Sequence, residues 1–99
     1  MQSKRDRVYF FLTRLADLMR QGMPLFESIQ LTRDELNEPV WRDEISAIEL
    51  GLECGSVFDE LLGEDLSPAV QEILKVGYEN GTLDTACKEA AELLQSSVS

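Results

Sequence analysis

The chain has 99 residues, of which nineteen are acidic and nine basic, so its formal charge is −10, and it contains no histidine. One domain accounts for this length, and an apolar fraction of 43% is ordinary for a globular fold, so a disordered chain is not expected. The acidity excludes nucleic acid as a partner, because phosphate contacts need a basic face, and the lack of histidine excludes catalysis and metal binding that depend on imidazole.

The first two predicted helices cover residues 5–21 and 24–36. The apolar stripe of the first consists of Val8, Leu12, Leu15 and Met19. The stripe of the second consists of Leu25, Ile29, Thr32 and Leu36. Both have helical spacing. Gly22 is a natural stop just after a helix, Pro24 suits the first turn of the next one, and Asn37 ends the second helix.

The third and fourth predicted helices follow Pro39. The third runs to about residue 52, and its amphipathic stripe consists of Trp41, Ile45, Ile48 and Leu52. Gly51 and Gly55 weaken its end. A short fourth helix is predicted over 56–62, and a turn follows at 63–65.

The last two predicted helices begin at residues 68 and 83. Ser67 caps the fifth, with Pro68 in its first turn, and Asn80 and Gly81 end it. Thr82 can cap the sixth, whose stripe consists of Leu83, Ala86, Cys87, Ala90 and Leu94. Because no segment alternates with period two and the turns are tight, we predict an all-α fold: a six-helix antiparallel up-and-down bundle over residues 1–99, frayed at 1–4 and 96–99.

Charge is unevenly distributed along the chain. Residues 1–20 carry five bases and two acids, for +3, whereas residues 21–99 carry four bases and seventeen acids, for −13. The longest apolar run, residues 8–12, is shorter than the ~7–15 residues of a signal peptide and far below the ~20 of a membrane span. The sequence therefore predicts a soluble, cytoplasmic segment.

The polar clusters of the sequence do not have the pattern of a catalytic site. Adjacent carboxylates such as 43–44 and 59–60 are typical of solvated helix faces. Cys54 and Cys87 have no histidine to activate them, and we expect reduced, partly buried thiols. Glu79 and Asp84 supply oxygen ligands without the spacing of an EF-hand, which leaves an isolated calcium site as one interpretation.

The segment 77–84 also has a purely structural interpretation. Asp84 falls in the first turn of the sixth helix, where its negative charge is favourable for the helix dipole. Gly81 suits the left-handed position that ends the fifth helix. A corner between two helices needs no ligand, and no catalytic residue or cofactor is predicted.

Three stretches of the sequence together resemble one family. Residues 11–25 are similar to an opening of the form F-x-x-x-L-A-x-L-hydrophobic-x-x-G-x-P-L, in which Leu15, Gly22 and Pro24 occupy marked positions. Residues 77–84 are similar to a closing G-E-x-S-G-x-L-D, which marks Gly77, Gly81, Leu83 and Asp84. Residues 55–62, beginning at Gly55, are similar to a looser middle motif. The chain resembles the type II secretion system F domain, which the inner-membrane platform protein of type IV pili (the PilC type) shares.

This resemblance implies a six-helix cytoplasmic bundle within a multi-pass inner-membrane protein, with membrane spans expected after residue 99. It implies a non-enzymatic scaffold on the cytoplasmic face of the inner membrane, which links an assembly ATPase and other platform proteins to pilin extrusion. Many members form homodimers through these domains. No cofactor is implied.

The departures from the family pattern are informative. Tyr78 replaces the usual glutamate, in a region where some relatives hold a metal ion at a subunit contact, and Val57 replaces the serine of the middle motif. The first motif begins about ten residues from Met1, which favours a type IVb branch such as the toxin-coregulated pilus.

Partner contacts are expected through exposed apolar side chains, with Phe10, Phe26, Trp41 and Tyr78 as candidates and core packing as the alternative for each. The acidic faces around 34–44 and 59–65 are a second candidate surface, with solubility as the alternative. The other function considered is a free-standing acidic helical adaptor or regulator that binds a protein partner.

Overall fold

The computed structural model describes residues 4–56, 58, 62 and 66–96. Its helices are α1 (Lys4–Arg20), α2 (Leu25–Asp34), α3 (Pro39–Glu53), α5 (Pro68–Asn80) and α6 (Leu83–Ser96). No strand occurs among the described residues, so the prediction of an all-α fold is confirmed. The predicted number of six helices is not matched, because the described residues form five. The helix predicted at 56–62 includes residues 57 and 59–61, which lie outside the described part.

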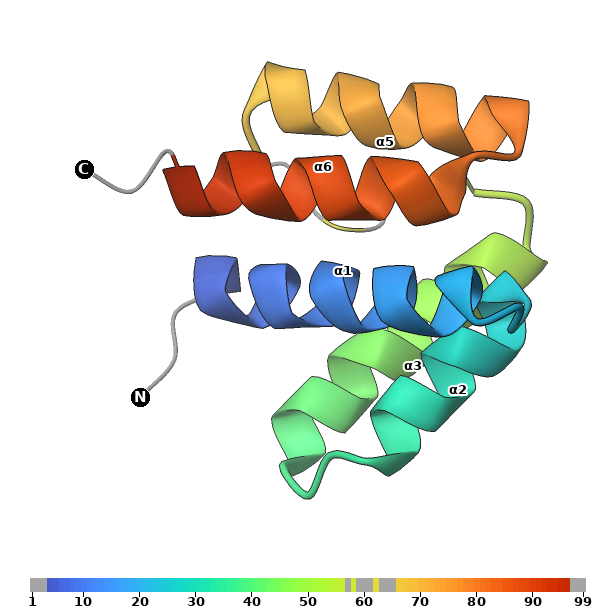
Figure 1. Ribbon diagram of the computed structural model, residues 1–99. Coiled ribbons are helices and arrows are strands. Elements are labelled where there is room, and N and C mark those ends of the chain that lie inside the picture. Colours follow the sequence, from blue (N-terminus) through green and yellow to red (C-terminus); the bar gives the residue numbers. More distant parts are fainter. Residues whose placement is uncertain (1–3, 57, 59–61, 63–65, 97–99) are drawn as a thin grey trace.

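The helices form two groups that cross at an angle (Figure 1). In one group α1 packs antiparallel to α6, and α6 packs antiparallel to α5. In the other, α2 and α3 form an antiparallel hairpin that is inclined to α1, and both of its helices contact α1. The antiparallel order predicted for neighbouring helices holds within each group, but the α2–α3 hairpin is inclined to the other group instead of lying alongside it. The turn after α1 explains why, since Gly22 is left-handed and Pro24 is extended, and together they direct α2 away at an angle.

Glycines end α1 and α5 as the sequence predicts. Gly22 has a φ of 100°, and the N–H of Met23 donates to the carbonyl of Leu18 at 3.1 Å. Gly81 has a φ of 74°, and the N–H of Thr82 donates to the carbonyl of Gly77 at 2.9 Å. These bonds satisfy carbonyls that a helix end leaves without partners, and only glycine enters this conformation without steric cost.

The starts of α2 and α5 differ in detail. Pro24 was expected in the first turn of α2 but precedes it as the N-cap, with an extended ψ of 158°. At the other end, the N–H of Leu36 bonds to the carbonyl of Arg33, so the predicted last turn becomes a tighter turn after Asp34. The Ser67 hydroxyl accepts from the N–H of Val70 and caps α5 as predicted.

The core lies where α1 meets the other helices, and the predicted stripes line it. Its most deeply buried apolar side chains lie on α1, α2, α5 and α6 and at Phe58: Leu12, Leu15, Ile29, Phe58, Val70, Leu74, Cys87 and Ala90. The stripe of α3, from Trp41 to Leu52, is buried as predicted. Thr32 is buried as well, and its hydroxyl donates to the carbonyl of Ser28 one turn earlier. Among the described residues, no helix has the length and apolar character needed to cross a bilayer.

Candidate functional site

The two best-defined motifs of the sequence meet at one end of the molecule. The turn after α1 and the turn between α5 and α6 both lie at the right in Figure 1. Side chains and backbone from both turns line a shared hollow of about 440 Å³, which we term the motif corner: Met19, Met23, Pro24, Leu25, Tyr78, Gly81, Leu83 and Asp84. Residues almost sixty positions apart in sequence thus form one surface.

Gly77 sets the distance between α5 and α6 beside this corner. It is buried inside α5, and a Cβ built at this position would collide with the Cβ of Ala86 on α6. The carbonyl oxygen of Thr82 is also near, at 3.3 Å. Glycine is therefore needed here for close approach, and the tight α5–α6 contact places Leu83 in the core, where it is 7% exposed.

Tyr78 has a packing role at the position where the resemblance leads one to expect glutamate. Its ring stacks on that of Phe58, with centroids 6.3 Å apart and an angle of 18° between the planes. Tyr78 is half-buried against the core and also lines the motif corner. An aromatic ring can make this contact, whereas a carboxylate there would lose hydration against Phe58.

The two carboxylates considered for calcium do not share one environment. Asp84 is half-buried in the first turn of α6 and lines the motif corner, whereas Glu79 is exposed on α5 and is not part of that lining. No group of three or more acidic or cysteine side chains that could hold a metal ion occurs in the described ranges. The presence of an acid at position 84 is explained by the structure, because its negative charge is favourable at the start of α6.

The four aromatic contact candidates have different environments. Phe10 and Phe26 are 39% and 38% exposed, whereas Trp41 is 6% exposed and Tyr78 is half-buried. Phe10 lies against Trp41, with ring centroids 5.3 Å apart. Phe10 and Phe26 therefore offer surface to a partner, and the rings of Trp41 and Tyr78 mainly pack within the fold. Gly55, the marked residue of the middle motif, follows α3 at the surface.

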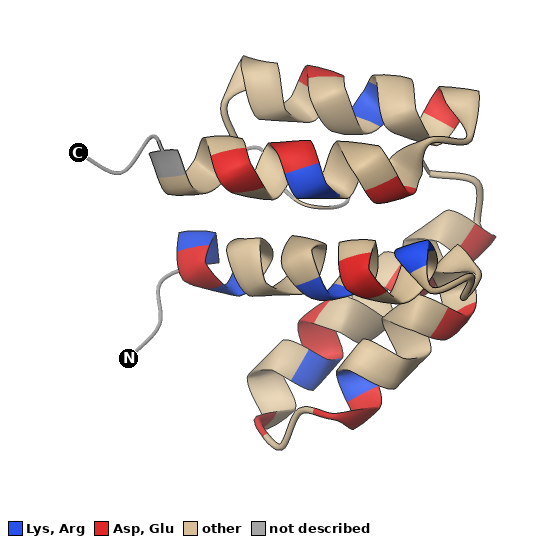
Figure 2. Ribbon diagram, in the orientation of Figure 1, with Lys and Arg blue, Asp and Glu red and all other residues tan. Residues whose placement is uncertain are grey.

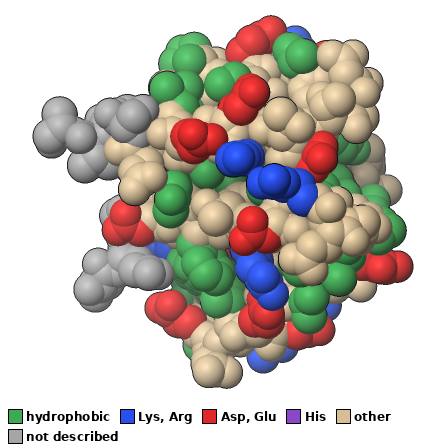
Figure 3. All heavy atoms as spheres, viewed as in Figure 1, with side chains coloured by type: hydrophobic (Ala, Val, Ile, Leu, Met, Phe, Trp, Pro, Cys, Tyr) green, Lys and Arg blue, Asp and Glu red, His purple; other side chains and the backbone are tan. Residues whose placement is uncertain are grey.

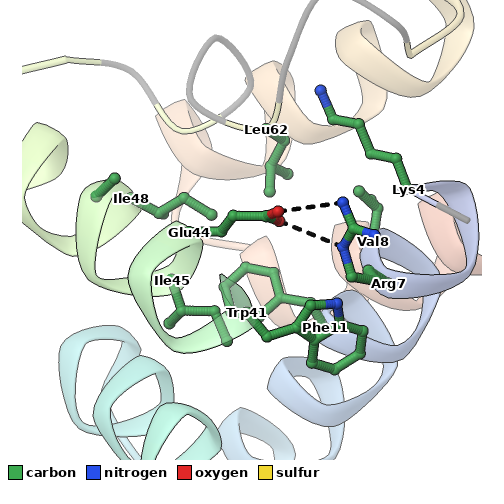
Figure 4. Close-up of a pocket in the computed structure, with 10 residues that line it drawn as sticks. Lys4, Arg7, Val8, Phe11, Trp41, Glu44, Ile45, Ile48 and Leu62 are labelled. Carbon is green, nitrogen blue, oxygen red and sulfur yellow. Dashed lines mark hydrogen bonds and ion pairs between the residues drawn. The ribbon is translucent and has the colours of Figure 1, made fainter. Parts of the chain in front are cut away.

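Sequence reasoning missed a groove between α1 and α3, which we term the α1–α3 groove (Figure 4). It has a volume of about 510 Å³, and residues of α1, residues of α3 and Leu62 line it: Lys4, Arg7, Val8, Phe11, Trp41, Glu44, Ile45, Ala47, Ile48 and Leu62. The signal was present in the sequence, since the α1 members follow a spacing of 3, 1 and 3, and on α3 the residues Trp41, Glu44, Ile45 and Ile48 do the same. The same spacing is typical of a helix face that packs in the core, so it did not indicate a groove.

Arginines of α1 pair with acids of the α2–α3 hairpin. Arg7 forms a two-pronged pair with Glu44, with the shorter N–O distance at 3.1 Å, and Arg14 forms one with Glu35 at 2.9 and 2.7 Å. The hydrogen bonds from Arg14 hold the pKa of the Glu35 carboxyl below its ordinary value. The basic start of the sequence is thus partly neutralised in space, and Figure 2 shows bases at intervals along α1 and acids on both helices of the hairpin.

The visible face of the molecule mixes the two charges. Figure 3 shows basic side chains near the middle of this face, over α1 and α6, with acidic side chains around them. Between α2 and α3, Arg33 pairs with Glu49 at 2.8 Å, and Gln30 donates to the same carboxylate. Such pairs add little stability, because each one contributes only about 0.2–1 kcal/mol.

The thiols are reduced but differ in burial. Cys87 is buried in α6, where loss of hydration raises the pKa of its thiol to about 12. Cys54 is exposed after α3, which corrects the expectation that both thiols are partly buried. Burial therefore keeps the Cys87 thiol protonated at neutral pH.

Comparison with known proteins gives one family. The model of the family described as type II secretion system (T2SS), protein F, matches residues 11–99. No curated protein matches the chain. The match includes all three motifs, both turns of the motif corner and each of the described helices from the second half of α1 onward. Proteins of this family are inner-membrane platform components of secretion and pilus machinery and are not known enzymes. The chain belongs to the type II secretion system protein F family.

Proposed function

We propose that the chain is a non-enzymatic scaffold of a type IV pilus or type II secretion platform, on the cytoplasmic face of the inner membrane. In this role it couples a cytoplasmic assembly ATPase to pilin extrusion by protein contacts. The family match over residues 11–99 carries the proposal. The type IVb branch stays a prediction.

The surface supports a role in protein contact. Phe26 projects from α2 with more than a third of its side chain exposed, and Leu31 is exposed on the same helix. Both lie on the hairpin that inclines away from α1, where a partner can reach them (Figure 1). Large exposed aromatic side chains are frequent anchors of protein interfaces. We therefore propose Phe26 as a contact to the ATPase or to another platform protein, with Phe10 as a second contact.

Binding to the assembly ATPase of the same machine tests this proposal. We expect the purified chain to bind the purified ATPase in isothermal titration calorimetry. Phe26→Ser should weaken binding at least about tenfold, as loss of an anchor does. Val76→Ser is the matched control, since Val76 is 42% exposed on α5, away from the hairpin. Equal weakening by both variants would contradict the role of Phe26, and absence of any binding would contradict coupling to the ATPase.

A further inference from the structure

Helix α3 has a second stripe besides the one that it buries in the core. The second stripe follows a spacing of 3, 4, 3 and 4, and each member is exposed: Val40, Asp43, Ala47, Leu50 and Cys54. We term these five residues the outer stripe. Val40 and Leu50 are 61% and 60% exposed, more than any other large apolar side chain in the described part of the chain. Single exposed apolar side chains are ordinary on a surface, but their alignment along one helix calls for an explanation.

The spacing of the outer stripe is that of a seam between two helices. Residues alternately three and four positions apart occupy the a and d positions of a heptad, which face a neighbouring helix. Asp43 is the only charged member of the stripe, and one polar residue in such a seam fixes the register of the two helices. Because α3 packs mainly against α2 and lies at the edge of the fold (Figure 1), its outer stripe is open to one further helix.

The hairpin that carries the outer stripe is strongly acidic. Residues 25–54, which include α2 and α3, contain eight acids and two bases. The pairs that Arg7 and Arg14 of α1 form with this hairpin reduce its net charge from −6 to −4. Every lysine and arginine of the chain belongs to the described residues, so no side chain outside them adds a positive charge to this surface.

Two acids beside the outer stripe favour a basic occupant. Neither Asp43 nor Glu53 has an ion-pair partner among the described residues. Glu53 is the last residue of α3, whose last turn contains no base, although the negative end of the helix dipole favours a cation there. A lysine or arginine of a partner is therefore favourable at both positions. A second copy of this chain, with a charge of −10, and an anionic membrane surface are both repelled.

We infer that the outer stripe of α3 binds a basic amphipathic helix of a partner protein. The apolar side chains of this helix pack against Val40, Ala47 and Leu50. Its lysines or arginines pair with Asp43 within the seam and with Glu53 at the end of α3. The site is separate from the motif corner and from Phe26, and the inference does not depend on the proposed function.

A synthetic helical peptide of about three heptads is the probe. It has leucines at the a and d positions, lysines on both flanks and one lysine in place of a central leucine, to face Asp43. Repulsion between the flanking lysines keeps the peptide from pairing with itself. Fluorescence anisotropy of the labelled peptide measures the Kd, and nuclear magnetic resonance on the ¹⁵N-labelled chain locates the site. We expect saturable binding, with amide shifts concentrated at residues 40–54. A peptide with glutamates in place of the lysines should bind at least about tenfold more weakly.

Two variants of the outer stripe, each with a matched control on α5, test the apolar and the charged contacts. Leu50→Ser should raise the peptide Kd at least about tenfold, whereas Val76→Ser, at a position 42% exposed, should leave it within about twofold. Asp43→Lys should raise the Kd at least about fivefold, whereas Glu72→Lys, the same change of charge at another exposed acid, should leave it within about twofold. All four side chains are exposed, and circular dichroism checks that the variants fold.

Three results would overturn the inference. The first is the absence of saturable binding of the basic peptide, or amide shifts that lie mainly outside α3. The second is equal weakening of binding by a variant of the outer stripe and its control on α5. The third is a dimer of the chain alone in sedimentation velocity that Leu50→Ser dissociates, since the outer stripe would then be an interface between two copies. All three are distinct from a failure to bind the ATPase, which is measured with another protein and with Phe26 of α2.

Discussion

Gly77 gives the sharpest test of how α5 and α6 pack. In an isolated helix, Gly→Ala is favourable by about 1 kcal/mol, because alanine loses less backbone entropy. In this protein the new Cβ collides with the Cβ of Ala86, and a methyl group has no rotamer by which it could move aside. The Thr82 carbonyl at 3.3 Å closes a second side, so the two helices have to separate.

The magnitude follows from these opposing effects. Overpacking a close contact costs about 1–3 kcal/mol, and a collision with a rigid neighbour belongs at the upper end. Subtracting the gain of about 1 kcal/mol in helix propensity leaves a net loss of about 2 kcal/mol for Gly77→Ala. For a domain of this size, such a loss lowers the Tm by roughly 8–16 °C.

Urea unfolding followed by circular dichroism measures this loss, and the neighbour supplies the control. Ala86→Gly removes the colliding methyl group, so the double variant Gly77→Ala with Ala86→Gly should show a favourable coupling of at least about 1 kcal/mol. The reasoning is refuted if Gly77→Ala is as stable as the unaltered chain, as helix propensity alone predicts. It is also refuted if the effects of the two substitutions simply add.

Three further predictions concern single sites. Gly81→Ala places a Cβ on a residue in the left-handed conformation and should lower the free energy of unfolding in urea by about 1–2 kcal/mol. Gly81→Asn should lower it less, because asparagine tolerates this conformation better. Equal losses of stability in the two variants would contradict the importance of φ at this turn. The pKa of Glu35 is lower in the folded chain than the ordinary glutamate value of 4.5, so its pair with Arg14 stabilises the fold at any pH above 4.5. This stabilisation is lost as the pH falls through the lower pKa of the folded state. Glu35→Gln should therefore reduce stability at neutral pH by less than about 1 kcal/mol and leave it unchanged in acid, and a difference that persists in acid would argue against the pair. An aromatic disulfide reagent should label Cys54 alone in the native chain and Cys87 only in urea, and rapid labelling of both thiols would show that α6 is not packed as described.

Local signals in the sequence predicted most helix ends correctly, because these ends depend on a few neighbouring residues. Gly22, Ser67 and Gly81 act where their conformational preferences place them, within one hydrogen-bonded turn. The stripe of α3 was equally predictable, since a spacing of 4, 3 and 4 fixes which side of a helix is apolar. The end of α2 was harder to predict from the sequence, because a tighter turn at Leu36 competes with one more turn of helix.

The angle between the two helix groups and the roles of the aromatic residues depend on contacts across the chain. Trp41 has the spacing of a core residue and the size of an interface residue, and only its neighbours decide between the two. The inclination of the α2–α3 hairpin likewise follows from the turn at 21–24 and from the pairs of Arg7 and Arg14, which join residues 37 and 21 positions apart. The motif corner was visible only as two separate motifs until the fold joined them.

Deletion of the gene in its own bacterium tests the central claim most directly, with surface pili and secreted substrates scored in the same strains. The account predicts that pilus assembly or secretion is lost, that the assembly ATPase remains present and hydrolyses ATP in extracts, and that the unaltered gene restores assembly. Normal pili and normal secretion in the deletion strain would contradict the claim that this helical domain belongs to an assembly platform.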